Sequence, residues 1–286
     1  MALLRRGLLL LALAAATEAR GVSLEFSELT CTLAKRKGKP ARRLLSDVAG
    51  RATPGRLLAI MGPSGSGKTT LLNALAGQVV ASPGLELSGR LVVDGAGPCQ
   101  SAADGGARAC AFVQQQDLFY AQMTVAETLR MAARLRLPRE LPRAEKLARA
   151  DEVLRKLGLS KAAGTLVGDE KGARGVSGGE KKRLAIACEL IDQPELIFLD
   201  EPTSGLDAYQ AEQVVQALRD LSREGCTVVC VIHQPSGKVF SLFDDLLLLS
   251  EVWQQRACSL SLAGDVAQVP SPLVFDDLCC CARRAR

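Results

Sequence analysis

The sequence predicts an α/β fold, in which a mostly parallel β-sheet is covered by helices. Short apolar runs of strand length alternate with longer segments that have helical spacing and end at glycine. Of the 286 residues 48% are hydrophobic, which is enough to bury a sizeable core. The formal net charge is only +5, and no basic stripe is evident, so we expect no nucleic-acid partner.

The predicted strands are short apolar or alternating segments, several of which are bounded by glycine or proline. Their ranges are Val22–Leu33, Leu44–Val48, Arg56–Met61, Arg90–Asp94, Leu196–Leu199, Thr227–Ile232 and Leu246–Leu249. The run at 196–199 is apolar throughout, and the run at 227–232 is apolar after Thr227, as in strands that are buried on both faces.

The predicted helices begin at capping residues and end at glycine or proline. Their ranges are Lys68–Ala76, Thr124–Leu137, Ala144–Leu157, Glu180–Leu190 and Ala208–Glu224. Thr124 with Glu127 three residues later fits a capping box. The stretch at about 118–176 is helical in pattern and rich in Arg, Leu and Ala, so we predict an inserted helical subdomain there.

The two ends of the chain differ from the rest. Residues 1–20 contain a short basic stretch and then Gly7–Ala16, which is almost purely Leu and Ala. About ten apolar residues are too few to span a bilayer, which needs about twenty, so we expect a targeting-like or membrane-contacting segment, with organelle targeting as one alternative. Residues 252–286 show no clear periodicity, and we expect them to be irregular.

A phosphate-binding loop lies between a predicted strand and a predicted helix. Gly62–Thr69 fits the pattern G-x-x-x-x-G-K-S/T. Glycines let the backbone wrap closely around phosphate, and the helix N-terminus adds its positive end. Lys68 would place a charge on the β- and γ-phosphates, and the Thr69 hydroxyl would ligate Mg²⁺. The residues expected to contact ATP or GTP are Gly62, Pro63, Ser64, Gly65, Ser66, Gly67, Lys68, Thr69 and Thr70.

Two carboxylates follow the apolar strand at 196–199. In open α/β sheets, ligands bind at the carboxyl ends of the strands, where Asp200 and Glu201 would lie. Asp200 is expected to hold Mg²⁺, and Glu201 is expected to be the general base that deprotonates the attacking water.

A second anion site is predicted at the start of the helix that Ser177 caps. Ser177, Gly178 and Gly179 open this helix, and a cap alone would not require two glycines. Two phosphate-binding helix ends far apart in the sequence suggest that one nucleotide is gripped by two subunits.

In combination, Gly62–Thr69, Val176–Glu180 and Leu196–Glu201 resemble the ATP-binding cassette (ABC) ATPases. Four longer segments are similar in sequence to subfamily G, the white-type half-transporters. They are Met61–Gly77, Val176–Ile191, Phe198–Asp207 and Val231–Ser236 (VIHQPS). The resemblance covers about residues 23–251. It implies a P-loop NTPase core over residues 22–251, with a parallel sheet, a small antiparallel β subdomain and the helical subdomain.

The resemblance also implies roles for three further residues. Gln115, chosen over Gln114 and Gln116 by its register with Asp117, matches the glutamine that contacts Mg²⁺ and the attacking water. His233 matches the histidine that touches the γ-phosphate. Asp207 is the acidic member of the loop that crosses the dimer interface.

The function implied by the resemblance is ATP binding and Mg²⁺-dependent hydrolysis that powers export of a lipid or small organic molecule. Two such domains would meet head to tail and drive a transmembrane domain, with the ATPase domain facing the cytosol. White-type transporters continue into membrane helices and this chain does not, which predicts a truncated product. The alternatives are a truncated regulator that binds ATP and pairs with full-length transporters, and a soluble ABC ATPase.

Two departures from the family pattern are visible. Glu180 replaces the glutamine that is more usual in the wider family, although glutamate is normal in subfamily G. No aromatic residue lies between Arg36 and Met61, so the sequence does not indicate which residue contacts adenine.

Overall fold

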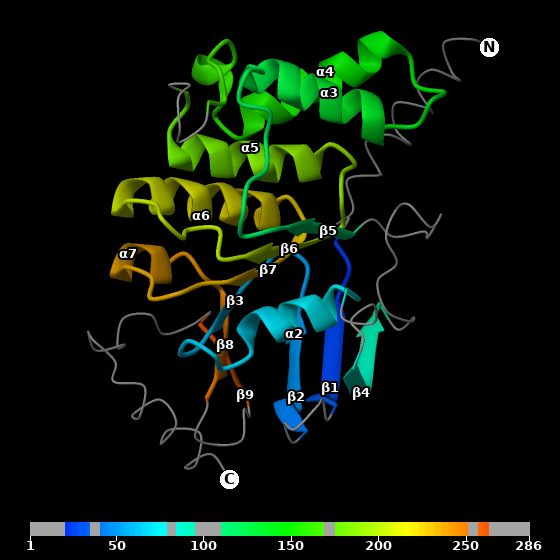
Figure 1. Cartoon of the computed structure of the whole chain (residues 1–286), viewed down its shortest axis with the longest axis vertical. Helices are drawn as coiled ribbons and strands as arrows, with labels where there is room; N and C mark the ends of the chain where they lie inside the picture. The colour runs from blue at the N-terminus through cyan, green and yellow to red at the C-terminus, as the bar shows by residue number, and fades with distance from the viewer. Residues whose placement is uncertain are drawn as a thin grey trace, which may run out of the picture.

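The computed structural model describes residues 21–34, 41–78, 84–94, 110–168, 175–250 and 257–262. The expected N-terminal segment 1–20 and most of the tail lie outside these residues. Within the described part, the prediction of an α/β fold is confirmed: two sheets and a set of helices form the molecule (Figure 1).

A six-stranded sheet lies at the centre of the domain. Its strands stand in the order β5 (Cys110–Val113), β6 (Leu196–Asp200), β7 (Thr227–Val231), β3 (Leu57–Met61), β8 (Asp245–Leu249) and β9 (Ala257–Ser261). The first five are parallel, and β9 pairs antiparallel with β8. Every residue of β3, β6 and β7 is buried, which explains their continuous apolar runs.

A three-stranded antiparallel sheet lies at one end of the molecule. It consists of β2 (Arg42–Ala52), β1 (Leu24–Leu33) and β4 (Leu85–Val93) in that order. Helix α2 (Lys68–Leu75) contacts β6 and β7 of the larger sheet and β2 of this one, so it lies between the two sheets. Their shared core contains Leu58, Ile60, Leu71 and Leu75.

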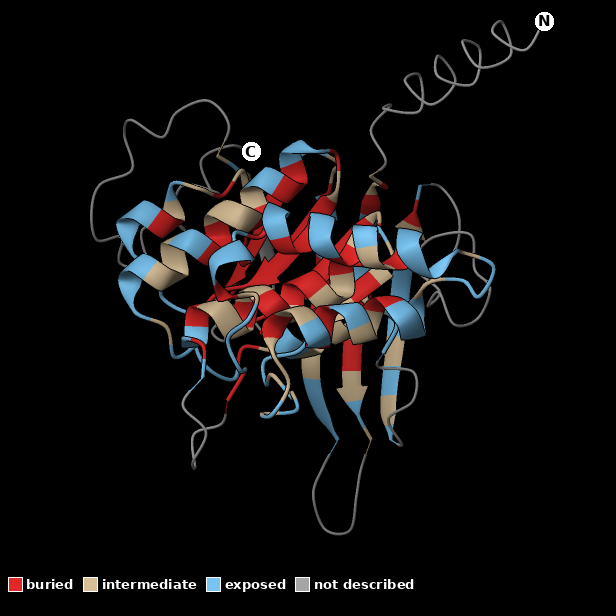
Figure 2. Cartoon of the chain, turned by 90° about the horizontal axis from the view of Figure 1, so that it is seen from above, coloured by how far each residue is buried: buried red, intermediate tan, exposed pale blue. Residues whose placement is uncertain are grey.

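The other helices lie on the opposite side of the six-stranded sheet from α2 (Figure 1). They are α3 (Val125–Arg136), α4 (Arg143–Lys156), the short 3₁₀ helix η3 (Ser160–Ala162), α5 (Gly178–Leu190), α6 (Ala208–Arg223) and α7 (Gly237–Phe240). Helices α3 and α4 pack against each other at the end of the molecule opposite the antiparallel sheet (Figure 1). Seen from above, buried residues fill the centre and exposed residues follow the outer faces of the helices (Figure 2).

The structure corrects one expectation and adds one strand. Residues 252–286 were expected to be irregular, but Ala257–Ser261 form β9. Strand β9 covers the otherwise open edge of β8, where unpaired N–H and C=O groups would need partners. Strand β5 was not among the predicted strands, although its four residues, CAFV, are all apolar. Among the described residues, no helix is long and apolar enough to cross a membrane.

Candidate functional site

The predicted catalytic and phosphate-binding segments follow neighbouring strands of the six-stranded sheet. Gly62–Thr69 follows β3, Gln115 follows β5, Asp200 and Glu201 stand at the end of β6, and His233 follows β7. Because these strands are parallel and adjacent, their carboxyl ends meet at one edge. Residues 172 positions apart therefore lie close together, as the hydrogen bond from Ile232 N to Ile60 O at 3.0 Å illustrates.

The phosphate-binding loop is closed around the side chain of Lys68. Lys68 is only 6% exposed, and its Nζ donates to the carbonyl oxygens of Gly62 at 3.0 Å and Pro63 at 2.8 Å. Gly67 has φ 92°, and a Cβ added there would lie 2.9 Å from the Leu44 carbonyl oxygen. Glycine is therefore required at position 67 both by the backbone conformation and by the close approach of β2.

The hydroxyl of Thr69, at the start of α2, lies beside the carboxylate of Asp200, at the end of β6. Thr69 Oγ1 donates to Asp200 Oδ1 at 3.2 Å. Burial raises the pKa of Asp200, the hydrogen bond from Thr69 partly offsets this, and the neighbouring charge of Glu201 adds to the increase. A hydroxyl and a carboxylate are hard oxygen ligands, and Mg²⁺ is typically bound by one or two carboxylates together with substrate phosphates. The residues present therefore fit a Mg²⁺ ion bound with a nucleotide.

Gln115 and Glu201 are in direct contact, although 86 positions separate them. Gln115 Nε2 donates to Glu201 Oε2 at 2.9 Å. Glu201 has φ 47°, an uncommon conformation for a non-glycine residue, and its N–H donates to the Val231 carbonyl oxygen at 3.1 Å. Backbone strain of this kind is concentrated at functional sites. Of the three consecutive glutamines at 114–116, Gln115 is the one whose side chain contacts the Glu201 carboxylate.

An open hollow of 630 Å³ extends outward from Glu201. It is lined by Ser64, Glu201 and His233 together with the loop Ser204–Leu206. His233 is exposed and precedes Gln234, which has φ 44°. The His233 imidazole, the Glu201 carboxylate and Ser64 of the phosphate-binding loop therefore surround one open space.

The second predicted anion site, at the start of α5, lies on the other side of the six-stranded sheet from α2 (Figure 1). Ser177 caps α5 through a capping box with Glu180: Ser177 Oγ accepts from Glu180 N at 3.3 Å, and the Glu180 carboxylate accepts from Ser177 N at 2.8 Å. The glutamate that departs from the wider family therefore stabilises the helix start. Within this chain, the six-stranded sheet lies between α5, which Ser177 caps, and α2, which begins at Lys68 (Figure 1).

The two glycines of α5 have a packing role that the sequence did not show. A Cβ at Gly178 would lie 3.2 Å from Leu206 Cδ2, and one at Gly179 would lie 3.0 Å from Gln210 Cβ. The Gly179 N–H donates to Gln210 Oε1 at 2.9 Å. Both glycines allow α6 to approach the start of α5, and one backbone donor of the predicted anion site is already occupied by Gln210.

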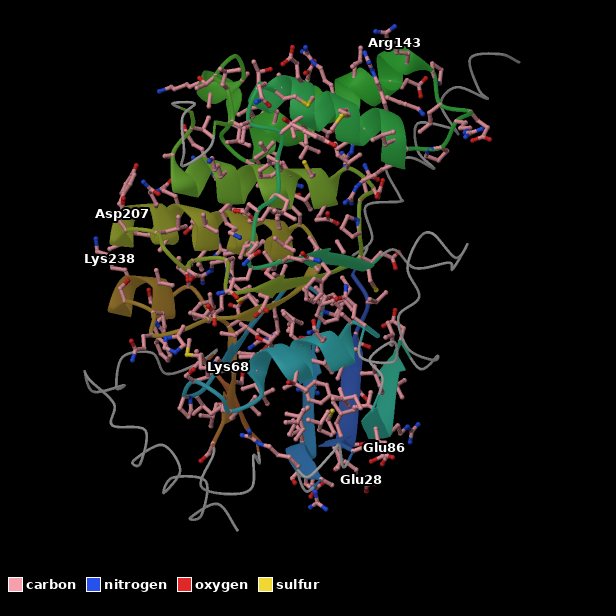
Figure 3. The ribbon with its side chains drawn as sticks, in the orientation of Figure 1. Glu28, Lys68, Glu86, Arg143, Asp207 and Lys238 are labelled. Atoms are coloured by element: carbon pink, nitrogen blue, oxygen red, sulfur yellow. The ribbon has the colours of Figure 1, made fainter. Side chains whose placement is uncertain are left out.

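Asp207 has a local role at the start of α6. Its Oδ1 accepts from Gln210 N at 2.8 Å, which makes it the N-cap of this helix. Figure 3 shows Asp207 at the outer end of α6 and Lys68 at the start of α2. Asp207 is exposed, and it follows the loop that lines the hollow.

Sequence reasoning did not single out two polar side chains of this region. Gln210 contacts Gly179, and Lys182 contacts the loop that contains Gln115. Both contacts join segments that are distant in the sequence, and neither residue belongs to a motif with a recognisable spacing. Only the register of α5 and α6 against the sheet reveals them.

Comparison with known proteins is consistent with this geometry. A family model described as ABC transporter matches residues 45–204. ABC transporter G family member 7 of Arabidopsis thaliana is 54% identical over 232 residues, which are 81% of this chain and 31% of that protein. Protein white of Drosophila melanogaster is 48% identical over 217 residues, which are 74% of this chain and 30% of that protein. The chain thus spans about a third of the length of these relatives.

Among solved structures, the dimeric structure of MJ0796, a bacterial ABC transporter cassette, matches with a TM-score of 0.65 and 26% identity. The match covers 84% of this chain and 99% of that one. A second structure of this cassette, a dimeric post-hydrolysis state bound to ADP and Pi, also matches with a TM-score of 0.65. Its identity is 24%, so this second match supports the fold alone.

Proposed function

Because the chain belongs to the ABC transporter family, we propose that it is an ATP-hydrolysing domain that powers export by a subfamily G transporter. The observation that carries the proposal is the pair of contacts at the sheet edge: Thr69 with Asp200 and Gln115 with Glu201. Together they set a pair of oxygen ligands and a carboxylate base beside a phosphate-binding loop. The cargo would be a lipid or a small organic molecule, as the subfamily G resemblance implies.

The phosphate contacts fall to the loop and the start of α2. In this proposal Lys68 turns from the Gly62 and Pro63 carbonyl oxygens to the β- and γ-phosphates of ATP. Phosphate oxygens carry a negative charge, whereas these carbonyls are neutral, so the ammonium gains from the exchange. The N-terminus of α2 and the backbone N–H groups of Gly62 and of residues 64–70 would supply the other donors.

Thr69, Asp200 and Gln115 would hold Mg²⁺, which when bound would neutralise charge on the transferring phosphoryl group. Glu201 would accept a proton from the attacking water as the new P–O bond forms and the bond from the γ-phosphorus to its bridging oxygen breaks. Gln115, hydrogen-bonded to Glu201, orients this carboxylate and the water. His233, which lines the same hollow as Glu201, would donate to the γ-phosphate.

The partner in this proposal is a second ABC nucleotide-binding domain. Within one chain the six-stranded sheet separates the helix that Ser177, Gly178 and Gly179 open from the helix that begins at Lys68, so these residues would cap ATP that the partner domain holds. Asp207 and the preceding loop, which line or adjoin the hollow, would contact the partner. Closure of the dimer would then move a transmembrane domain, with this domain on the cytosolic side of the membrane.

A mixing experiment tests the head-to-tail site. Lys68→Ala and Ser177→Arg variants are each assayed alone for Mg²⁺-dependent ATPase activity, and each is expected to be inactive because every site in its homodimer is damaged. In an equimolar mixture, a mixed dimer combines Lys68 of one chain with Ser177 of the other and has one intact site. Activity should therefore return on mixing.

The control for this experiment is Lys238→Ala, which changes a side chain that is 81% exposed on α7. Mixing it with Lys68→Ala should add only its own activity. A mixture of Lys68→Ala and Ser177→Arg that stays inactive, with both variants folded by circular dichroism, would contradict the composite site.

A further inference from the structure

A buried lysine ties the start of α5 to the loop that contains Gln115. Lys182 Nζ donates to Asp117 Oδ1 at 2.8 Å, to the Gln115 carbonyl oxygen at 3.0 Å and to the Gln114 carbonyl oxygen at 3.3 Å. All three donor positions of the ammonium are therefore directed at one loop of four residues. The side chain of Lys182 is 5% exposed and that of Asp117 is 15% exposed.

The cost of burying this ammonium indicates a specific purpose. A charged group that leaves water must be paired and hydrogen-bonded to be tolerated, and an apolar residue of similar volume is often no less stabilising. The neighbouring Leu184 and Ile186 of α5 are apolar and fully buried. A purely structural contact between α5 and β5 needs no lysine, whereas a contact with main-chain carbonyls needs a donor.

The bonded carbonyls belong to the residues that set the position of the Gln115 side chain. Gln115 is exposed and stands in a segment without helix or strand, so regular secondary structure does not fix it. Its side-chain amide nevertheless reaches Glu201 at 2.9 Å. Lys182 holds the backbone of Gln115 from the side of α5, through the hydrogen bond from its Nζ to the Gln115 carbonyl oxygen.

Lys182 also lies five residues after Ser177 on the same helix. A shift of α5 relative to the sheet would therefore pull on this loop through three hydrogen bonds, one of which is to the Gln115 carbonyl oxygen. The helix that carries the predicted partner-facing residues is thereby linked to the glutamine at the proposed catalytic carboxylate.

We propose that Lys182 is a positioning residue for ATP hydrolysis, which acts by holding the Gln115 loop so that Gln115 reaches Glu201. This inference rests on the proposed function. Removal of the ammonium leaves the phosphate-binding loop intact, so ATP binding should survive while turnover falls.

The test combines steady-state kinetics with a double-mutant cycle. Lys182→Met keeps an unbranched side chain, one atom shorter, and removes its donors. We expect kcat to fall about 10- to 100-fold, as for a misplaced catalytic group, with the KM for ATP within about twofold of the original. If Lys182 acts through Gln115, the double variant Lys182→Met/Gln115→Ala should have a kcat within about twofold of that of Gln115→Ala alone.

Lys181→Met is the matched control. Lys181 is the preceding residue of α5, but its Nζ donates to the Gly168 carbonyl oxygen at 3.0 Å and not to the Gln115 loop. We expect its kcat to stay within about twofold of the original value. If Lys182→Met does not fold, Asp117→Asn serves in its place, because it removes only the carboxylate that pairs with Lys182. Its loss in kcat should be smaller, and this loss should not multiply with that of Gln115→Ala.

Amide hydrogen exchange provides a readout that does not depend on activity. Without nucleotide, exchange across residues 112–120 should be faster in Lys182→Met than in the original chain and unchanged in Lys181→Met. Unchanged exchange in Lys182→Met, or losses in kcat that multiply with Gln115→Ala, would overturn the positioning role. Absence of ATPase activity in the unsubstituted chain would contradict the proposed function instead, and exchange would still decide whether the tether exists.

Discussion

Replacing Glu201 by Gln tests the proposed base while preserving the surrounding contacts. Glu201 Oε2 accepts the Gln115 amide at 2.9 Å, and a glutamine amide oxygen in the same place can accept the same bond. Glu201→Gln therefore removes the negative charge and the proton acceptor but not the geometry. The contacts of Lys68 and the Thr69–Asp200 pair do not involve this carboxylate.

The expected loss follows from the role of a general base. Such a group contributes typically 10²–10⁴-fold to a rate, and each factor of ten corresponds to about 1.36 kcal/mol in the activation free energy. The activation barrier should therefore rise by about 2.7–5.4 kcal/mol. ATP affinity should change little, and a dimer that closes on ATP but cannot hydrolyse it should accumulate.

The assay is single-turnover hydrolysis of radiolabelled ATP with enzyme in excess, so that product release does not limit the measured rate. Calorimetric titration of ATP and size-exclusion chromatography with ATP and Mg²⁺ report binding and dimerisation. Glu195→Gln is the matched control, because it makes the same chemical change away from the site. Glu195 directly precedes the amino end of the same strand, β6. Hydrolysis by Glu201→Gln at the rate of the original chain would refute the assignment of the base.

Three further outcomes are expected. Lys68→Ala removes a charge-assisted phosphate contact of about 1.5–3 kcal/mol, so ATP should bind about 10- to 100-fold more weakly by calorimetry, with Lys238→Ala unchanged; equal affinity in Lys68→Ala would exclude the phosphate contact. Gln210→Ala frees the Gly179 N–H from a bond worth about 0.5–1.5 kcal/mol, so ATP-driven dimerisation should tighten by roughly two- to tenfold in sedimentation analysis; weaker dimerisation would show that Gln210 supports the site instead of blocking it. Phe198→Ala truncates a fully buried side chain and should lower the free energy of unfolding by about 3–5 kcal/mol in urea titration; a loss below about 1 kcal/mol would mean that the core rearranges.

Local sequence patterns predicted much of the fold. The capping box of Thr124 and Glu127 forms as expected, with hydrogen bonds of 2.9 Å and 3.2 Å, because both partners lie within one helical turn. The buried strands β3, β6 and β7 were recognisable because burial on both faces requires an unbroken apolar run. Strand β9 was missed, because its pairing depends on the exposed edge of β8 and not on its own pattern.

The candidate site divides in the same way. The sequence alone determined the phosphate-binding loop, since Gly62–Thr69 is contiguous and its geometry follows from a strand, a turn and a helix start. It also placed Asp200, Glu201 and His233 after strands. The resemblance had already selected Gln115 among the three glutamines. Only the tertiary structure decided that Gln115 contacts Glu201, that Gln210 occupies the Gly179 N–H, and that Lys182 holds the Gln115 loop. Each of these contacts joins residues 31 to 86 positions apart, and their distances depend on how α5 and α6 pack on the sheet, which no local pattern specifies.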